Sequence, residues 1–125
     1  MSMSESKKRI LIADDEIEIR EILKDLLEDL GEVTCVENGV QALNELGRRT
    51  YHLLITDYNM PEMNGMSLLK RLNELGVHMG VIWITGRSTR ELRVEAWDQG
   101  VVDYIEKPFQ LDQVRKSVLR SLSMI

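Results

Sequence analysis

The stretch Arg9-Ile-Leu-Ile-Ala-Asp-Asp-Glu16 contains the unit from which the rest of the chain is built. Within residues 9–13, Arg9 is followed by a continuous apolar run, which is typical of a strand buried on both faces of a sheet. After the acidic residues, isoleucine and leucine recur at three- and four-residue spacing from Ile19 to Leu30, which predicts an amphipathic helix ended by Gly31. This stretch therefore predicts a buried strand followed by a helix.

The strand–helix unit recurs along the whole chain. The expected strands are residues 9–13, 33–36, 53–56, 81–84 and 101–105. Apolar residues at helical spacing follow them over residues 19–30, 40–46, 68–75, 92–96 and 111–122. Strands that alternate with helices in this way predict an α/β domain. We expect a doubly wound, five-stranded parallel sheet with right-handed crossovers and helices on both faces.

Length and composition limit the classes of protein to which the chain can belong. Its 125 residues, with 43% apolar and 30% charged residues, suit one domain with a buried core. We assign residues 1–8 to a polar leader, which lacks the apolar centre of a secretory signal, and residues 9–125 to the domain. A net charge of −5 argues against direct nucleic-acid binding. Without a membrane-length apolar run, and with Cys35 as the single cysteine, the expected location is the cytoplasm.

Polar residues follow four of the expected strands at the point where each strand ends. Asp14 and Asp15 follow the first strand, Asp57 the third, Thr85 the fourth and Lys107 the fifth. The carboxyl ends of parallel strands meet at one edge of the sheet, where ligands bind. Clustered carboxylates repel one another, and a hard cation such as Mg²⁺ (or Mn²⁺) relieves that repulsion. With a lysine and a hydroxyl nearby, the set predicts a site for phosphoryl transfer onto a carboxylate.

Each of these residues also has an ordinary structural interpretation. The pair Asp14-Asp15 is compatible with a helix N-cap and its first-turn charges, and Thr85 with the cap of the following helix. Asp57 is compatible with a turn residue, and Lys107-Pro108 with a simple bend. These interpretations would have to hold independently at four strand ends, so we favour the single shared site.

Four motifs of the chain resemble the receiver domain of bacterial two-component response regulators. They are Ile10-Leu-Ile-Ala-Asp-Asp-Glu16, Leu54-Ile-Thr-Asp-Tyr-Asn-Met-Pro61 with Asn64-Gly65, Ile84-Thr-Gly86, and Asp103-Tyr-Ile-Glu-Lys-Pro-Phe109. The resemblance extends over essentially the whole chain after Lys8. It implies a flavodoxin-like (βα)5 fold with strand order 2-1-3-4-5.

The resemblance also implies a role for each acid. Asp57 is similar to the phosphoacceptor, which takes the phosphoryl group from a phosphohistidine on a sensor histidine kinase or a phosphotransfer protein. The carboxylates of Asp15 and Asp57 and the backbone carbonyl of Asn59 are similar to direct magnesium ligands. Asp14 is similar to the acid that holds the metal through water.

The resemblance also implies roles for the residues that take part in the chemistry beside the acids and in its readout. Lys107 would bind a phosphoryl oxygen, and its peptide bond to Pro108 is expected to be cis. Thr85 and Tyr104 are similar to the switch pair that moves on phosphorylation. The side chains of Asn59 and Arg87 occupy positions at which side chains tune the lifetime of the phosphoryl group.

Phosphorylation is expected to change the surface formed by the fourth helix, the fifth strand and the fifth helix. Arg90, Val94, Trp97 and Tyr104 are the residues that we expect on this partner face. The alternative for Trp97 is burial beneath a neighbouring loop. The downstream partner is expected to be a protein, and a dimer linked to phosphorylation stays open. With no output module after Leu122, we expect a stand-alone receiver or the N-terminal part of a longer regulator.

The expected protein is a signalling module, and the only reactions that it would catalyse are its own phosphorylation and dephosphorylation. An aspartyl-nucleophile phosphatase would carry its nucleophile after the first strand and a second carboxylate two residues later, whereas Asp14 and Asp15 are adjacent. A flavin carrier would need a phosphate-binding loop where this chain has three acids. The remaining rival is a degenerate receiver that acts as an unphosphorylated scaffold.

Overall fold

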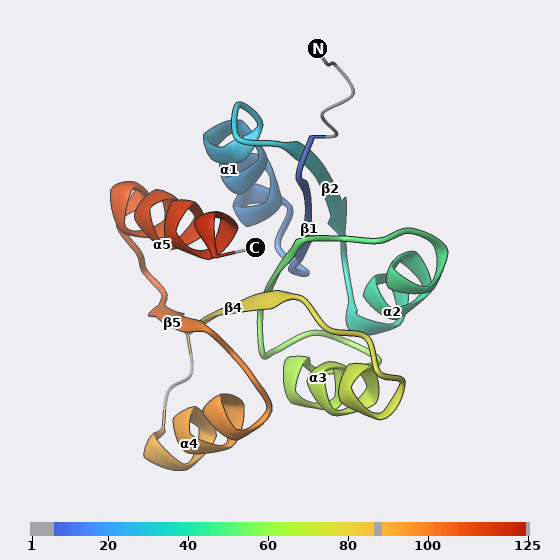
Figure 1. The fold of residues 1–125 in the computed structure, drawn as a ribbon. Helices are drawn as coiled ribbons and strands as arrows, with labels where there is room; N and C mark the ends of the chain where they lie inside the picture. The colour runs from blue at the N-terminus through green and yellow to red at the C-terminus, as the bar shows by residue number, and fades with distance from the viewer. Residues whose placement is uncertain (1–6, 87–88, 125) are drawn as a thin grey trace.

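The computed structural model describes residues 7–86 and 89–124, which form alternating strands and helices (Figure 1). The leader residues 1–6 and the predicted lifetime-tuning residue Arg87 lie outside the described residues. The elements in chain order are β1 (Arg9–Ala13), α1 (Ile17–Leu27), β2 (Glu32–Val36), α2 (Gly39–Arg48), β3 (Leu53–Thr56), α3 (Gly65–Glu74), β4 (Gly80–Thr85), α4 (Arg90–Asp98), β5 (Asp103–Glu106) and α5 (Leu111–Ser123).

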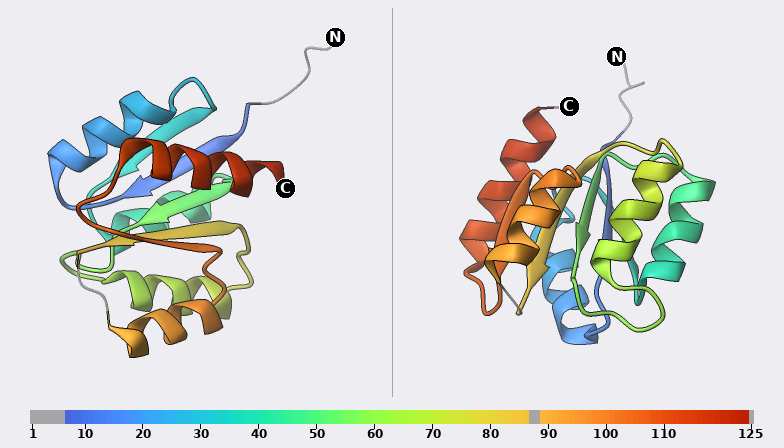
Figure 2. Two further views of the ribbon diagram at one scale, coloured as in Figure 1. Left: turned by 90° about the vertical axis from the view of Figure 1, so that its left-hand side faces the viewer. Right: turned by 90° about the horizontal axis from the view of Figure 1, so that it is seen from below.

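The five strands form one parallel sheet in the order β2-β1-β3-β4-β5, which confirms the expected topology. Figure 2 shows α1 and α5 on one face of the sheet and α2, α3 and α4 on the other. The chain first winds outward from β1 to β2 and then returns across β1 to β3. This reversal of direction brings the carboxyl ends of β1 and β3 together in the middle of the sheet.

Two apolar clusters, one on each face of the sheet, hold the layers together. Side chains along each strand alternate between them, as the two-residue period of a strand requires. On β4, for example, Ile82 and Ile84 belong to the cluster under α1 and α5. Val81 and Trp83 belong to the cluster under α2, α3 and α4. The continuous apolar run of this strand is explained because both of its faces are covered.

Side-chain caps begin three of the helices. Asn38, Asn64 and Thr89 each accept a hydrogen bond from a backbone N–H in the first turn of α2, α3 and α4. The predicted end of α1 at Gly31 is wrong, because the helix ends at Leu27. Gly31 instead lies so close to β1 that a Cβ atom there would be 2.4 Å from the carbonyl oxygen of Lys8.

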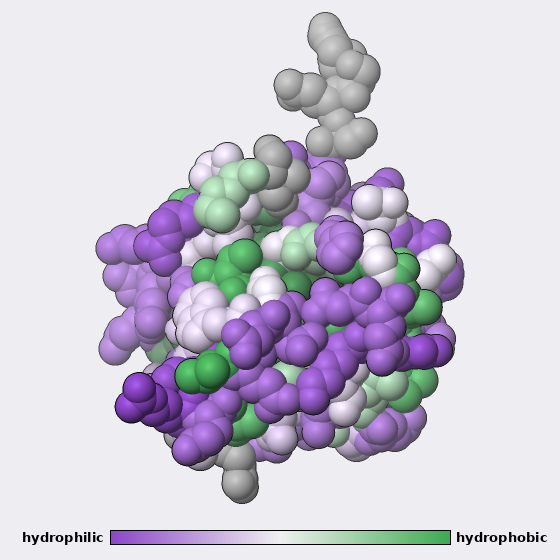
Figure 3. All heavy atoms as spheres, turned by 60° about the horizontal axis from the view of Figure 1, so that its bottom comes forward, coloured by the Kyte–Doolittle hydropathy of each residue, from purple (hydrophilic) through white to green (hydrophobic). Residues whose placement is uncertain are grey.

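The outer surface is mostly hydrophilic on the side shown in Figure 3, and its hydrophobic side chains form small separate patches. Among residues 7–86 and 89–124, no helix is both long and apolar enough to cross a bilayer.

Candidate functional site

The acids of the site come from the ends of two adjacent strands. The backbone N–H of Asp57 donates to the carbonyl of Ala13 at 3.0 Å, which holds the end of β3 against the end of β1. The side chains of Asp14 and Asp57 are almost completely buried, with residue exposures of 2% and 5%, and Asp15 is exposed. One carboxylate oxygen from each of the three lies within 4.8 Å of the others. The structure therefore brings together the three acids that the strand ends predict.

Lys107 is the cation of this cluster. Its Nζ donates to Oδ2 of Asp14, to Oε1 of Glu16 and to Oδ2 of Asp57, each at 3.0 Å. Its backbone N–H donates to the carbonyl of Thr85 at 2.9 Å, which continues the pairing of β4 and β5 beyond the strands. The peptide bond between Lys107 and Pro108 is cis, as the resemblance implies.

Burial and hydrogen bonding act in opposite directions on these groups. Burial raises the pKa of Asp14 and of Asp57 above the ordinary value, although hydrogen bonds from Lys107 partly oppose it. Burial alone would lower the pKa of Lys107, but its bonds to Asp14, Glu16 and Asp57 outweigh that effect and raise it. Lys107 is therefore held as a cation. Keeping the two buried acids ionised costs free energy, because burial disfavours their charged form.

The charge of the cluster suits a divalent cation. Four carboxylates (Asp14, Asp15, Asp57 and Glu16) and one ammonium group (Lys107) give −4 + 1 = −3 in formal charge. The donor atoms are all oxygens, which favours Mg²⁺ or Mn²⁺ over the softer metals that histidine and cysteine bind. The residues that could hold such an ion are Asp14, Asp15 and Asp57. The donor set thus fits the expected metal.

The loop after β3 is tightly packed around the Asp57 carboxylate. The Asn59 N–H donates to Oδ1 of Asp57 at 3.3 Å, so the backbone of Asn59 lies beside the acid. The Gly65 N–H donates to the carbonyl of Tyr58 at 2.8 Å and closes the loop. A Cβ atom at Gly65 would lie 2.5 Å from the carbonyl oxygen of Asp57. Any side chain at Gly65 would therefore displace the backbone of Asp57.

The expected switch residues lie on the two strands nearest Lys107. Thr85 is fully buried at the end of β4, and Tyr104 is half-buried on β5. The alternative that Thr85 caps the next helix is wrong, because Thr89 occupies that position. The alternative that Asp14 or Asp15 caps α1 is also wrong, because Glu16 is the N-cap residue. Oδ1 of Asp14 instead accepts the Glu16 N–H at 2.9 Å.

The expected partner face lies on the outer side of α4. Val94 and Trp97 are 52% and 48% exposed, and Arg90 is exposed. Trp97 is therefore not buried beneath a loop. Tyr104 belongs to the neighbouring strand β5 and packs partly against the core. The structure thus exposes three of the four predicted residues and leaves the fourth between core and surface.

Two features of the site were not assigned any role from the sequence. Glu16 is the third acid bonded to Lys107, and the only signal for it is its position next to Asp14 and Asp15. Trp83 lies fully buried in the core, and its ring lies between those of Tyr58 and Tyr104. An aromatic residue two positions before Thr85 was the available signal.

Comparisons with known proteins agree with this geometry. The model of the response regulator receiver domain family matches residues 10–119. The chain is 37% identical to the chemotaxis protein CheY of Pseudomonas aeruginosa over 114 residues, which cover 88% of this chain and 92% of CheY. It is 35% identical to the transcriptional regulatory protein CrdR of Helicobacter pylori over 116 residues, which cover 91% of this chain but 54% of CrdR. The chain thus spans about half the length of that regulator.

Similarity extends to solved structures. The crystal structure of a CheY-like response regulator receiver domain protein from Methanospirillum hungatei JF-1 superimposes with a TM-score of 0.90 at 29% identity. The superposition covers 95% of this chain and 96% of that chain.

Proposed function

The chain belongs to the response regulator receiver domain family of two-component systems, and we propose that it accepts a phosphoryl group on Asp57 in a Mg²⁺-dependent reaction. The donor would be a phosphohistidine on a sensor histidine kinase or on a phosphotransfer protein. One observation carries the proposal. Asp57 shares Lys107 with Asp14 at 3.0 Å, so nucleophile, metal-binding acid and cation already meet at one point.

The chemistry follows from what each group can contribute. An Asp57 carboxylate oxygen attacks phosphorus, the bond from phosphorus to the histidine nitrogen breaks, and that nitrogen keeps the electron pair. Charge develops on the three equatorial oxygens during this transfer. Lys107 is held at the site as a cation and pairs with one of these oxygens. The Thr85 hydroxyl, at the end of the adjacent strand β4, donates to another.

The metal would be held by Asp15, Asp57 and the backbone carbonyl of Asn59, with Asp14 binding through water. When bound, it supplies positive charge that the acid cluster lacks and that the incoming phosphoryl group needs. Within the protein, Asp14 and Glu16 keep Lys107 oriented toward Asp57. The Asn59 side chain is exposed beside the acceptor, where it would affect access of water to the phosphoryl group and thereby its lifetime. Arg87 is proposed to share that role.

The proposed output is a change in the surface of α4, β5 and α5, where Arg90, Val94, Trp97 and Tyr104 would meet a downstream protein. Support comes from the half-exposed Trp97 and Val94, because large apolar side chains of this exposure are common in protein contacts. The same face would serve a phosphorylation-linked dimer. The module would act in the cytoplasm and would catalyse only its own phosphorylation and dephosphorylation.

The decisive experiment is the intact mass of the protein after incubation with a small phosphodonor and Mg²⁺. Wild-type protein should gain one phosphoryl group, and the adduct should be lost in Asp57→Asn and after chelation of the metal. Asp25→Asn is a matched control, because Asp25 is an exposed acid on α1. An adduct that persists in Asp57→Asn would move the acceptor elsewhere. No adduct on wild-type protein would favour the unphosphorylated scaffold.

A second experiment tests the partner face. Sedimentation of the phosphorylated protein distinguishes a dimer from a monomer that binds another protein. If the face forms a dimer, Trp97→Ala should abolish it. Leu75→Ala is the matched control, because Leu75 is a similarly exposed apolar residue at the C-terminal end of α3. A phosphorylated dimer that is equally stable in both variants would remove Trp97 from the interface.

A further inference from the structure

Three aromatic rings lie in a row beside the acceptor, and Trp83 is the middle one. The rings of Tyr58 and Trp83 are stacked, with centroids 5.5 Å apart and planes at 28°. The rings of Trp83 and Tyr104 are 6.1 Å apart and tilted by 54°. Both separations fall within the range in which aromatic pairs attract beyond simple burial. The row thus joins the loop after Asp57 to the expected readout residue.

The pairing of the strands explains why these rings meet. Thr56 on β3 is opposite Trp83 on β4, and Trp83 is opposite Tyr104 on β5. Opposite residues in a sheet place their side chains on the same face, and so do residues two apart on one strand. Thr85 therefore shares the face of Trp83 and lies diagonally from Tyr104. Trp83 is next to both members of the expected switch pair.

The row is connected to the acceptor at one end and to the outer surface at the other. Tyr58 directly follows Asp57, and the hydroxyl of Thr56 donates to the Asp57 carbonyl at 3.0 Å. Tyr104 is half-buried on the edge strand β5. A shift of the acceptor loop consequently reaches Tyr58 within one peptide unit. From there the next side chain in line is Trp83.

Burial makes Trp83 a rigid member of the row. The residue is fully buried, and among the described residues no acceptor lies within hydrogen-bonding distance of its Nε1. An unsatisfied buried donor lowers the stability of the fold, so a side chain without any polar group would stabilise the core more than the indole does. What the indole provides in return is ring contact with two neighbours, because Tyr58 stacks on it and Tyr104 is tilted against it. Close-packed interiors transmit displacements because they have little free volume to absorb them.

We propose that Trp83 is a positioning residue that couples the acceptor loop to Tyr104. When Asp57 is phosphorylated, the Tyr58 ring moves with the loop, Trp83 follows, and the Tyr104 ring changes its environment. Trp83 touches neither the acceptor nor the phosphoryl group in this scheme. The inference rests on the proposed function, because it needs phosphorylation at Asp57 as the input.

The test uses 3-fluorotyrosine incorporation and ¹⁹F NMR. The chain has three tyrosines, so Tyr51→Phe and Tyr104→Phe variants assign the resonances. Tyr51 lies at the opposite end of the sheet, between α2 and β3, and serves as an internal control. In wild-type protein, phosphodonor with Mg²⁺ should shift the Tyr58 and Tyr104 resonances and leave that of Tyr51 in place. Intact mass of the same samples gives the phosphorylated fraction.

Two substitutions at Trp83 separate ring stacking from burial. Trp83→Leu should reduce the Tyr104 shift by about twofold or more at an equal phosphorylated fraction. Trp83→Phe keeps a ring in the row and should restore most of the response. An unchanged Tyr104 shift in Trp83→Leu would overturn the inference, and so would an equal loss in Trp83→Phe.

Tyr58→Leu provides a second route that leaves the core tryptophan in place, should Trp83→Leu fold poorly. It removes the ring on the acceptor side, so the Tyr104 shift should fall as it does in Trp83→Leu. A full Tyr104 response in Tyr58→Leu contradicts the coupling. If wild-type protein forms no adduct, the proposed function fails. If the adduct forms and the Tyr104 shift is independent of Trp83, only the present inference fails.

Discussion

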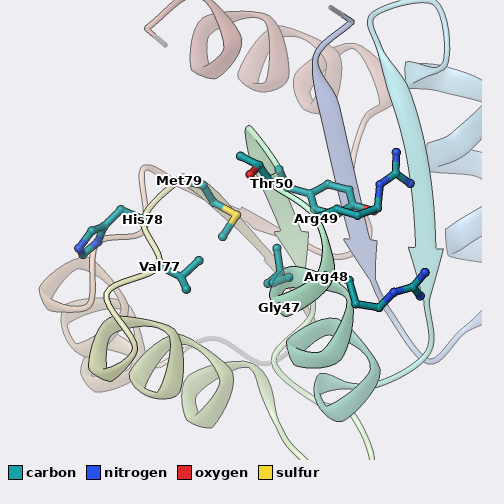
Figure 4. A pocket seen from close by; sticks show the side chains of 9 residues that line it. Gly47, Arg48, Arg49, Thr50, Val77, His78 and Met79 are labelled. Carbon is teal, nitrogen blue, oxygen red and sulfur yellow. The ribbon is translucent and has the colours of Figure 1, made fainter.

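The two ends of the sheet differ in what their side chains do. At the carboxyl end, acids from β1 and β3 and a lysine after β5 point at one another within hydrogen-bonding distance. At the amino end, the end of α2 and the α2–β3 and α3–β4 connections form an open pocket of about 280 Å³ lined by Leu46, Gly47, Arg48, Arg49, Thr50, Tyr51, Val77, His78 and Met79. Figure 4 shows the guanidinium groups of Arg48 and Arg49 directed away from Val77 and Met79.

The charged groups at the amino end are already paired with partners outside the pocket. Arg48 pairs with Glu45 at 3.3 Å, and Arg49 pairs with Glu32 at 2.7 Å. The hydroxyl of Tyr51 donates to the other oxygen of Glu45 at 2.6 Å. At the carboxyl end, one lysine serves three acids and leaves a negative charge unbalanced. Reactivity is thus expected at the carboxyl end, where the charges converge without full compensation. The pocket at the amino end does not by itself indicate a reactive site.

The largest difference between the two ends should appear when Lys107 is replaced. Lys107→Met leaves Asp14 and Asp57 buried without a cation, and should lower the free energy of unfolding by about 3 kcal/mol. Urea unfolding at neutral pH without added metal measures the change. Lys116→Met is the control, because Lys116 is exposed on α5 and should have little effect. Equal stability of the two variants would contradict the view of Lys107 as the main counter-charge.

Two glycine substitutions, one at each end of the sheet, compare how tightly the backbone is packed there. Gly65→Ala forces a Cβ against the backbone of Asp57 and should cost about 2 kcal/mol and slow phosphorylation. Gly47→Ala, in α2 at the pocket, meets nothing within 4 Å and should gain about 0.5–1 kcal/mol from helix propensity. Thermal unfolding and the rate of adduct formation check both. A stable, normally phosphorylated Gly65→Ala would mean that the acceptor loop is not tightly packed.

The dependence of stability on pH should also come from the carboxyl end. The folded-state pKa values of Asp14 and Asp57 are raised, so protonation favours the folded state and its benefit is lost as pH rises through them. Acidification from neutral pH toward the ordinary carboxyl range, without metal, should therefore raise Tm. Asp57→Asn should show a smaller rise and Asp25→Asn the full one. Parallel profiles in all three proteins would rule out a contribution from Asp57.

The smallest effect is expected at the amino end of the sheet. Tyr51→Phe removes the hydrogen bond to Glu45, which keeps its pairing with Arg48, and should cost about 0.5–1 kcal/mol. Phosphorylation of Asp57 should be unchanged, as measured by intact mass. A loss of phosphorylation in Tyr51→Phe would show that the two ends are energetically coupled, contrary to the comparison drawn above.

Much of the fold and of the candidate site could be predicted from the sequence. The strands at residues 9–13 and 53–56 were predicted from the apolar runs that they contain, and the structure has β1 and β3 at these same ranges. Because parallel strands end at a common edge, Asp14, Asp57 and Lys107 could be expected to meet there. The strand order, by contrast, came from the family resemblance, since apolar runs alone do not say which strands are neighbours.

Other features depended on details that a linear pattern does not contain. The end of α1 was predicted too late, because Gly31 suggests a helix terminus, whereas its actual constraint is the close approach of the Lys8 carbonyl just before β1. The helix cap at Thr89 lies four residues after the strand end at Thr85, and only the backbone geometry distinguishes these two threonines. Several positions in the sequence have the residue type that favours a helix end or a helix cap, and tertiary packing decides which of them is used.

The sequence by itself determined the kind of protein: an α/β domain with acids and a lysine at its strand ends and with the motifs of a receiver domain. Only the tertiary structure decided that Glu16 joins Asp14 and Asp57 around Lys107, and that Trp83 lies between Tyr58 and Tyr104. The physical reason is range. Periodicity and strand ends are properties of neighbours in the chain, whereas a hydrogen bond across 91 residues and a row of rings across three strands depend on register and side-chain direction.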